Sequence, residues 1–498
     1  IYLEAVPKRL YPNGELLSQT LGFVGLDNVG LAGIEYQFDN LLRGKAKKIK
    51  YLRDAKGRAF KFEAELIKDD SQDIVLTIDK DIQSFVEKSL KDGVLEFNAE
   101  SGGMGVMDSS NGEILAIANY PTFDPNTVLN SSEVHRKLSF ITDPFEPGSM
   151  FKTLTIISAF ENKNARPDTN YYCENGAFKV DDHIIGEAEK DKKFEWLSVA
   201  EILKHSSNIG TTKIAFDVKF PRLLKTWKNF NIGQKTGVEI PGESRGIFNE
   251  KDKIAPLTLS NMSFGQGLAT TGIQMLAAYA AIANGGYYVR PTIIKNDEIK
   301  NRVRIVSEKT IREIQKILVD VVEDGTGTNA QIPYFKIAGK TSTAQRVVKS
   351  GGYDGYIPGF VGYPINADKR FVILVYIINP QGQIYFGNNV AAPIFKKVAK
   401  YLLYKNKEFN NLEEVAQDKG TIIDSLKIRD ASTRIMGDNV VPNFIGLDKK
   451  SSTELAEKMS LKLVHQGIGV VVSQSPNPKS EIGGERKITL NYSPPKYE

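Results

Sequence analysis

Two residue types that together perform nucleophilic catalysis stand three positions apart in the stretch EPGSMFKT, residues 146–153. Ser149 follows a Pro-Gly pair and precedes an apolar run, so the pattern predicts a helix that begins at or near the serine. At positions i and i+3 of such a helix, the Lys152 amine faces the Ser149 hydroxyl. Burial favours the neutral amine, which is a competent base, and the helix N-terminus supplies partial positive charge and free amides. Taken alone, the pattern favours the simpler interpretation that the serine is an N-cap, because Ser-x-x-Lys is a very common string.

Two further polar groups lie downstream, and each has an ordinary structural explanation when taken alone. The first follows the helical stretch LSVAEILKH, where polar residues usually form a cap. The second lies in the β-branched, strand-like stretch KIAGKTSTAQRV, where polar side chains are typical of an exposed edge strand. The residues are Ser206, Ser207 and Asn208 in the first group, and Lys340, Thr341, Ser342 and Thr343 in the second.

In this order, the three groups resemble the active-site triplet of penicillin-binding proteins and serine β-lactamases, whose motifs are Ser-x-x-Lys, Ser-Asp-Asn and Lys-Thr-Gly. The neighbouring text also looks like class B penicillin-binding proteins, the monofunctional transpeptidases, in LGFVGLDNVGLAGIEYQFDNLLRG, LTIDKDIQ, FEPGSMFKT, HSSNIG, MSFGQGLATTGIQMLAAYAAIANGG, AGKTSTAQ and NNVAAPIFKK. The chain end, with VVPNFIGLD and GIGVVVSQSPNPKS, resembles a PASTA module. A class B enzyme with such a module resembles the cell-division, or septal, subgroup.

Mixed strand and helix patterns predict an α/β or α+β chain, and 498 residues suit roughly three domains. The resemblance narrows the fold class to α+β, with a central antiparallel sheet flanked by helices in the transpeptidase domain. It also implies four parts: a partial N-terminal pedestal of dimerisation type at 1–70, the transpeptidase domain at 71–406, a linker at 407–438 and a small β/α PASTA-like domain at 439–498.

Local patterns predict several elements of the transpeptidase domain. Residues Ile74–Ile78 alternate as a strand, and a helix with apolar residues at helical spacing starts near Asp79. The stretch GGMGVMDSSNGEILAIANYP, with Ser110–Gly112 between two apolar runs, predicts a hairpin. The stretch DKRFVILVYIINP is rich in β-branched residues and predicts a further strand.

The resemblance implies how the catalytic residues act. Ser149 would attack the carbonyl between the two terminal D-alanines of a peptidoglycan stem peptide, while Lys152 takes the proton. D-Ala would leave an acyl-enzyme, which the amine of a second stem peptide then attacks. Ser206 would relay a proton between Lys152 and the leaving nitrogen, and Asn208 would bind the substrate amide and help hold the lysine. The backbone amides of Ser149 and Thr343 would form the oxyanion hole.

Substrate binding is implied for the remaining motif residues. Lys340 would supply positive charge to the terminal carboxylate, with the Thr341 and Thr343 hydroxyls beside it. Ser207 and Ser342 complete the predicted substrate-binding set. Ser342 stands where the family usually has glycine, so its side chain either crowds a substrate along the strand or points away from it.

A second Lys-Thr stretch, at 235–237, spells the usual third motif letter for letter. It follows Ser206 much sooner than Lys340 does, and it precedes the long helical stretch at 275–283 that the motif strand should follow. Turn residues flank it in GQKTGVEIPGES, a pattern typical of a surface loop. We therefore assign the third motif to Lys340 and predict that Lys235 is an ordinary surface residue.

Composition limits the cofactors and partners. The net charge of +5 is a small excess, and no basic run with interleaved aromatic residues indicates nucleic acid. Cys173 is the one cysteine, which excludes an intrachain disulfide, and no Cys/His spacing indicates a metal site. The mechanism that the resemblance implies needs neither a metal nor an organic cofactor. The longest apolar runs fall far short of the roughly 18 residues that a membrane helix needs, and no signal-peptide pattern is present.

The resemblance also implies a location and partners. It places the chain in the bacterial cell envelope, at the outer face of the cytoplasmic membrane, with a membrane anchor expected upstream of Ile1. The substrates would be peptidoglycan stem peptides, and β-lactam antibiotics would be covalent inhibitors. A membrane glycosyltransferase and proteins of the division complex would be its protein partners.

Four other protein classes share part of this pattern. A class A β-lactamase would be a much shorter chain, and it needs a glutamate loop to hydrolyse its acyl-enzyme, which the sequence does not match. A bifunctional penicillin-binding protein needs a glycosyltransferase domain, for which the first 70 residues are too few. A D,D-carboxypeptidase differs only in its acceptor, and an inactive wall-binding scaffold would use the PASTA-like module alone; both stay open.

Overall fold

The chain folds into two compact units, Ile1–Phe409 and Asn410–Glu498. The predicted linker, 407–438, lies outside the described residues. A computed structural model describes residues 8–44, 52–53, 55–56, 59–60, 71–189, 192–248, 250, 253–296, 302–347, 351–406, 440–447, 449–467, 470–478, 480–482 and 486–493.

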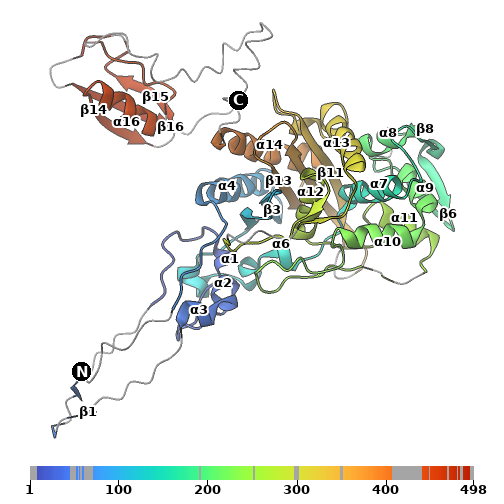
Figure 1. The fold of residues 1–498 in the computed structure, drawn as a ribbon, viewed down its shortest axis with the longest axis horizontal. Coiled ribbons are helices and arrows are strands. Elements are labelled where there is room, and N and C mark those ends of the chain that lie inside the picture. The colour runs from blue at the N-terminus through green and yellow to red at the C-terminus, as the bar shows by residue number, and fades with distance from the viewer. Residues whose placement is uncertain are drawn as a thin grey trace. The chain divides into compact units, whose positions relative to one another are not determined.

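A five-stranded antiparallel sheet forms the centre of the first unit (Figure 1), with the strand order β11-β12-β13-β3-β4. Its strands are β3 (Ser101–Asp108), β4 (Ile114–Tyr120), β11 (Ile337–Val347), β12 (Tyr353–Pro364) and β13 (Phe371–Ile378). β11 forms one edge, so the outer side of its backbone has no strand partner in the sheet. The predicted β3–β4 hairpin and the strands predicted at β11 and β13 are confirmed.

Helices cover both faces of this sheet: α4 (Lys80–Glu96), α12 (Gly272–Ala283), α13 (Glu308–Glu323) and α14 (Gly387–Lys405). On β3, Leu90 of α4 fills the space beside Gly102, whereas Leu276 of α12 fills the space beside Gly105. Since residues three apart on a strand face opposite sides, α4 and α12 lie on opposite faces. α14 packs against α4, and α13 packs against α12 and β11.

A helical region adjoins the β11 edge and contains α7 (Lys152–Glu161), α8 (Val199–Lys204), α9 (Asn208–Val218), α10 (Phe220–Asn229) and α11 (Pro256–Ser263). α7 is its central helix, because every residue from Lys152 to Phe160 is buried. A helix that is buried on all sides must be surrounded by other elements. α7 accordingly contacts α8, α9, α10 and α13.

The remaining elements of the first unit are short. The paired strands are β1 (Leu52–Arg53) with β2 (Ala59–Phe60), β5 (Asn170–Tyr172) with β8 (Trp196–Ser198), β6 (Ala177–Val180) with β7 (His183–Gly186), and β9 (Tyr287–Tyr288) with β10 (Val303–Arg304). The helical turns are α1 (Ser18–Leu21), α2 (Gly33–Gln37), α3 (Asp39–Arg43), η2 (Pro125–Asn130), α5 (Glu133–Arg136), α6 (Ser139–Thr142), η3 (Gly148–Phe151), η4 (Glu174–Gly176) and η5 (Thr328–Ala330).

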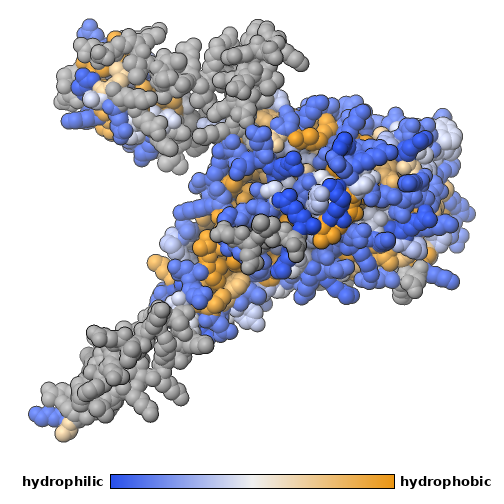
Figure 2. Space-filling model, viewed as in Figure 1, coloured by the Kyte–Doolittle hydropathy of each residue, from blue (hydrophilic) through white to orange (hydrophobic). Residues whose placement is uncertain are grey.

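The N-terminal segment that contains α1–α3 is hydrogen-bonded to the sheet domain. The Leu17 N–H donates to Glu87 of α4 (2.7 Å), and the Ser18 hydroxyl bonds the Thr122 hydroxyl (2.8 Å). The same segment also exposes large apolar side chains, and Figure 2 shows apolar surface in the region of α1–α3. These exposed side chains are Leu10, Leu26, Leu31, Tyr36 and Leu41.

Two predictions at the start of the transpeptidase domain have different outcomes. The predicted helix is confirmed, since α4 begins directly after Asp79, whose carboxylate caps its first turn. The predicted strand Ile74–Ile78 is wrong, because within this described segment Leu76 alone forms a bridge, to Ile294. Backbone hydrogen bonds from Thr77 to the Ile293 carbonyl and from Lys295 to the Val75 carbonyl (2.8 Å each) flank this single bridge, which is too short to count as a strand.

The second unit has its own sheet and core. Its elements are α16 (Lys449–Lys458), β14 (Lys462–Gly467), β15 (Val470–Ser475) and β16 (Lys487–Ser493). β16 is central, parallel to β14 and antiparallel to β15. Phe444, Leu455 and Leu490 are among the fully buried side chains of its core. The unit is therefore a small β/α domain that packs around apolar residues of its own.

Candidate active site

The turn that carries Ser149 has a backbone that requires glycine before the serine. It is the 3₁₀ turn η3, which runs directly into α7, and the Lys152 N–H donates to the Ser149 carbonyl. Gly148 has φ +52°, a left-handed conformation that favours glycine. A Cβ at this position would also lie 2.6 Å from Ser342 Oγ. Because Ser149 and Lys152 are three apart in one helical run, their side chains fall on the same side of it.

Lys152 is completely buried at the first residue of α7. Its Nζ donates to the Ser206 carbonyl (2.5 Å) and to Ser206 Oγ (3.2 Å). Burial lowers the pKa of Lys152 to about 7, and the nearby charge of Glu187 opposes this shift. A large neutral fraction near neutral pH makes this amine able to accept a proton.

Ser206 lies between α8 and α9 with φ +61°. A non-glycine residue in this conformation costs about 1–3 kcal/mol, so its neighbours must hold it there. The Ser206 N–H donates to the Leu203 carbonyl (3.3 Å), and the Ser207 N–H donates to the Ile202 carbonyl (2.9 Å). These bonds fix the junction so that both oxygens of Ser206 face Lys152 Nζ.

Lys340 reaches the same hydroxyl from β11. Its side chain is completely buried, and Nζ lies 3.0 Å from Ser206 Oγ. Burial, followed by the charges of Lys152 and Lys192, lowers the pKa of Lys340 well below its ordinary value. One hydroxyl therefore bridges two buried amines, and charging both amines at once is unfavourable. Lys152, Ser206 and Lys340 form a connected group that can pass a proton.

Ser342 points toward the turn that carries the nucleophile. Its Oγ donates to the Pro147 carbonyl (2.7 Å), and its side chain is buried. Because alternate residues of a strand face the same side, Ser342 lies on the same face of β11 as Lys340. The hydroxyl that replaces the usual glycine thus connects β11 to the backbone two residues before Ser149.

Thr341 and Thr343 alternate with Lys340 and Ser342 along the strand, so their side chains leave β11 on its other face. Thr341 Oγ1 donates to Thr326 Oγ1 (2.9 Å), and Thr343 Oγ1 accepts from the Gly387 N–H at the start of α14 (3.0 Å). Substrate contacts of the two threonines stay a prediction.

The contacts of Ser207 contradict the substrate contact that we predicted for it. Its side chain is completely buried at the N-terminus of α9. The hydroxyl accepts from the Gly210 N–H (3.0 Å) and donates to Glu187 Oε1 (2.6 Å). A buried hydroxyl that is satisfied in this way is a helix cap and is not available to a substrate.

The amide of Asn208 is directed at the backbone rather than at Lys152. Its Nδ2 donates to the Gly186 carbonyl (2.9 Å), and its backbone N–H donates to Glu187 Oε2 (2.7 Å). Lys152 Nζ instead bonds Ser206. The prediction that Asn208 helps hold the lysine is therefore wrong for this structure. Its contact with a substrate amide stays a prediction.

Two residues that the sequence did not indicate also support the site. The buried Tyr279 hydroxyl, on α12, donates to the Met150 carbonyl (2.9 Å) and bonds Thr153 Oγ1 (2.8 Å), so it braces the nucleophile turn. The sequence did contain a signal for Tyr279: it is the one tyrosine in the alanine-rich run MLAAYAAIA, and a buried tyrosine hydroxyl needs a hydrogen-bond partner. Glu187 follows β7 in a polar stretch, and no local pattern marks it.

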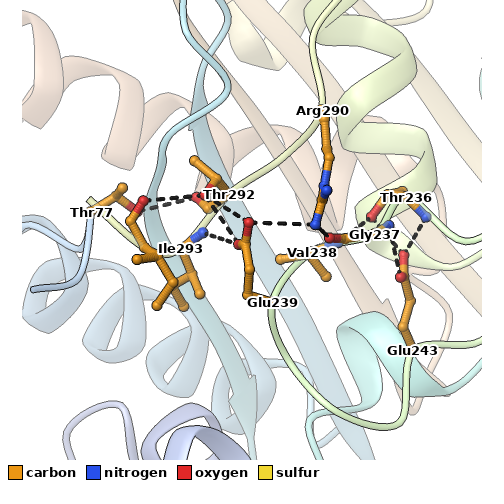
Figure 3. A network of polar contacts seen from close by, with 10 residues as sticks. Thr77, Thr236, Gly237, Val238, Glu239, Glu243, Arg290, Thr292 and Ile293 are labelled. Atoms are coloured by element: carbon orange, nitrogen blue, oxygen red, sulfur yellow. Dashed lines mark hydrogen bonds and ion pairs between the residues drawn. The ribbon is translucent and has the colours of Figure 1, made fainter. Parts of the chain in front are cut away.

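The second Lys-Thr stretch, 235–237, lies in a loop and belongs to no strand (Figure 3). The Thr236 N–H and hydroxyl both donate to Glu243 Oε1 (2.6 Å each), and the Gly237 N–H donates to Glu243 Oε2 (3.0 Å). Glu239, two residues further on, accepts from the Thr292 hydroxyl (3.1 Å). Lys235 itself is exposed, as predicted for a surface loop.

No cluster of three or more His, Cys, Asp or Glu side chains among the described residues is arranged to hold a metal ion. Among the described helices, none has both the length and the apolar composition that crossing a membrane requires. Cys173 is free and buried.

Three parts of the chain match known protein families. Residues 102–400, more than half of the chain, match the penicillin binding protein transpeptidase domain. Residues 1–76 match the penicillin-binding protein dimerisation domain, and residues 439–494 match the PASTA domain.

Curated relatives and solved structures are similar over most of the chain. Stage V sporulation protein D of Bacillus subtilis is 30% identical over 98% of this chain and 76% of the relative. Peptidoglycan D,D-transpeptidase FtsI of Escherichia coli K12 is 30% identical over 79% of this chain and 67% of the relative. The crystal structure of penicillin binding protein 3 from Mycobacterium tuberculosis, complexed with aztreonam, has a TM-score of 0.71 and 29% identity, over 80% of this chain and 90% of that one.

Proposed function

The chain belongs to the penicillin-binding protein transpeptidase family, and on that premise we propose that it is a class B peptidoglycan D,D-transpeptidase. It cross-links stem peptides through an acyl-enzyme on Ser149 and is acylated by β-lactams at the same atom. The observation that carries the proposal is the buried group Lys152–Ser206–Lys340, in which one hydroxyl lies 3.2 Å and 3.0 Å from two amines whose pKa values are lowered.

Acylation begins when the neutral Lys152 amine takes the proton of the Ser149 hydroxyl. Ser149 Oγ forms a bond to the carbonyl carbon between the two terminal D-alanines, giving a tetrahedral intermediate. The bond from that carbon to the amide nitrogen then breaks. The proton moves from Lys152 through the Ser206 hydroxyl to the leaving nitrogen, and D-Ala departs. The route is supported by the hydrogen bond between Lys152 Nζ and Ser206 Oγ.

Deacylation reverses the proton path. The amine of a second stem peptide attacks the ester carbon, and its surplus proton passes to Lys152. The Ser149 oxygen then leaves and recovers a proton from the lysine. Water in place of the amine would make the enzyme a D,D-carboxypeptidase, so the acceptor is the point at which these two activities differ.

The substrate itself can set the charges of the two lysines. Its terminal carboxylate favours the charged form of Lys340, because an opposite charge stabilises an ammonium in a buried site. A charged Lys340 then favours a neutral Lys152, which is the form that accepts the Ser149 proton. Substrate binding would thus activate the base through the Ser206 hydroxyl that the two amines share.

The oxyanion hole proposed at the Ser149 and Thr343 amides is supported by strand pairing. Thr343 of β11 is paired with Pro358 of β12. Proline has no N–H to donate, so this pair is one in which the backbone groups point away from each other. The Thr343 N–H would then point out from the free edge of β11, toward a substrate.

The remaining parts of the proposal concern binding and place. Asn208 binds the substrate amide, and Thr341 and Thr343 bind near the carboxylate; the Thr343 hydroxyl, which accepts from the Gly387 N–H, keeps its own proton to donate. We also propose that the enzyme works at the outer face of the cytoplasmic membrane in septal wall synthesis. Its partners there would be a membrane glycosyltransferase and division-complex proteins. The proposed domain limits are 1–70, 71–406 and 439–498, joined by 407–438.

A reaction with two synthetic stem peptides tests this function. The purified protein receives a donor that ends in D-Ala-D-Ala and an acceptor with a free side-chain amine. We expect release of D-Ala together with a cross-linked product, measured by mass spectrometry. D-Ala release without cross-linking, at saturating acceptor, would identify a carboxypeptidase. No release, with no penicillin adduct, would identify a scaffold.

A further inference from the structure

Glu187 binds the two residues that follow Ser206. Its Oε1 accepts from Ser207 Oγ (2.6 Å), and its Oε2 accepts from the Asn208 N–H (2.7 Å). The carboxylate lies just beyond β7, at the end of the β6–β7 hairpin. One side chain thus joins this hairpin to the start of α9 through two charge-assisted hydrogen bonds.

The same hairpin makes a third contact with this region. Asn208 Nδ2 donates to the Gly186 carbonyl (2.9 Å), so two successive residues of the hairpin end bind the first turn of α9. The residue before that turn, Ser206, has φ +61° and cannot keep this conformation without support from both sides. On the α8 side, this support comes from the hydrogen bonds of the Ser206 and Ser207 N–H groups to the Leu203 and Ile202 carbonyls. On the α9 side, it comes from Glu187.

We propose that Glu187 is a positioning residue, which holds Ser206 between Lys152 and Lys340 and keeps a negative charge close to the Lys152 amine. The proposal rests on the proposed transpeptidase function. Glu187 itself touches neither the nucleophile nor Lys152 through a hydrogen bond. Its hydrogen bonds to Ser207 and Asn208 help to fix the position of Ser206, and its negative charge acts on Lys152 through space.

Several charged groups face this pair of lysines. Lys340 approaches from β11, Lys192 adds positive charge near Lys340, and Glu187 adds negative charge near Lys152. The charges of Glu187 and Lys213 also lie near the buried Cys173 thiol, whose Sγ is 3.7 Å from Ser207 Oγ. The charge of Glu187 raises the pKa of Lys152 against the lowering caused by burial.

The sign of the expected pH effect follows from this balance. Acylation requires neutral Lys152, so its rate rises as the pH passes upward through the pKa of that amine. Removing the charge of Glu187 removes the influence that raises this pKa. The acid limb of the profile must therefore move to lower pH in a variant without the carboxylate. A contact that is only structural would lower the rate and leave the limb in place.

The test measures the second-order rate of acylation by a fluorescent penicillin across pH. Glu187→Gln keeps the shape and one acceptor oxygen but removes the charge, so we expect about a tenfold lower maximum rate and an acid limb at lower pH. Glu187→Asp keeps the charge, and its limb should stay in place. Asp182→Asn removes one carboxylate from the exposed β6–β7 turn and should change neither rate nor limb.

An unchanged maximum rate in Glu187→Gln overturns the positioning claim, and an unmoved limb overturns the charge claim. A second measurement keeps the inference testable if the wild type is not acylated at all, an outcome that would refute the proposed function. NMR titration of lysine labelled with ¹³C at Cε reports the protonation of Lys152 directly. A lower midpoint in folded Glu187→Gln than in wild type supports the inference, and equal midpoints contradict it.

Discussion

Two Lys-Thr stretches of this chain resemble the third motif, yet their surroundings make their lysines different chemical groups. At 235–237 the lysine is exposed, and the threonine and glycine bind the Glu243 carboxylate in a loop. At 340–342 the lysine is completely buried on an edge strand, 3.0 Å from Ser206 Oγ. Burial and partners, and not the motif letters, therefore decide which lysine has altered chemistry.

Lys340→Ala is the sharpest way to break this comparison. An ammonium that meets a carboxylate in a partly desolvated site contributes a few kcal/mol, at about 1.4 kcal/mol per factor of ten. We therefore expect β-lactam acylation to slow by roughly 100-fold or more. Stopped-flow fluorescence with a labelled penicillin measures the rate, and the melting temperature shows that the variant is folded. A folded variant with a nearly normal rate would show that Lys340 is not the carboxylate partner.

Ser342→Gly tests the residue by which the buried stretch differs from the usual Lys-Thr-Gly. The change removes the hydrogen bond to the Pro147 carbonyl, and such a bond contributes about 0.5–1.5 kcal/mol. We expect acylation to slow by up to about tenfold, with Ser342→Ala giving a similar loss. Faster acylation in the glycine variant would mean that the serine crowds the substrate and does not position the nucleophile turn.

Removal of the second unit extends the comparison from one residue to a whole region. Chain cleavage after Asp438 deletes the PASTA-matching part and leaves every predicted motif residue in place. Because that part has its own core, acylation should stay within about a few fold of the intact chain. A large loss in a truncated protein that remains folded would show that the second unit contributes to the active site.

Lys235→Ala should have the smallest effect. The residue is exposed, and ordinary surface substitutions change stability by about 0.5 kcal/mol or less. The acylation rate should therefore change by less than about threefold. Its comparison with Lys340→Ala under the same conditions is the control for both. If Lys235→Ala is the slower of the two, the third motif has been assigned to the wrong stretch.

Local patterns predicted the elements whose cause is local. α4 begins at the capping Asp79, and the β3–β4 hairpin turns at polar residues between two apolar runs. The strand predicted at Ile74–Ile78 is wrong, because alternation of apolar and polar residues indicates only that a segment is half-buried. It does not show that a partner strand runs alongside, and here the pairing is a single bridge. Fold class came from the family resemblance, which covers nearly the whole chain.

The candidate site also contains residues that local sequence motifs predicted and contacts that they could not predict. Motif letters placed Lys152, Ser206 and Lys340, which the structure brings together although they lie far apart in the chain. They could not show that the Ser207 hydroxyl donates to Glu187, because the fold brings that carboxylate from the end of the β6–β7 hairpin. Contacts of this kind join segments whose meeting is decided by the tertiary fold, and no window of sequence contains them.

The central claim is that Ser149 is the nucleophile, and adduct mapping tests it most directly. Wild-type protein and Ser149→Ala are incubated with a fluorescent penicillin, digested and examined by peptide mass spectrometry. We predict one adduct in the wild type, on the peptide that contains EPGSMFK, and none in a folded Ser149→Ala variant. An adduct on another serine, or labelling that persists in the variant, would contradict it.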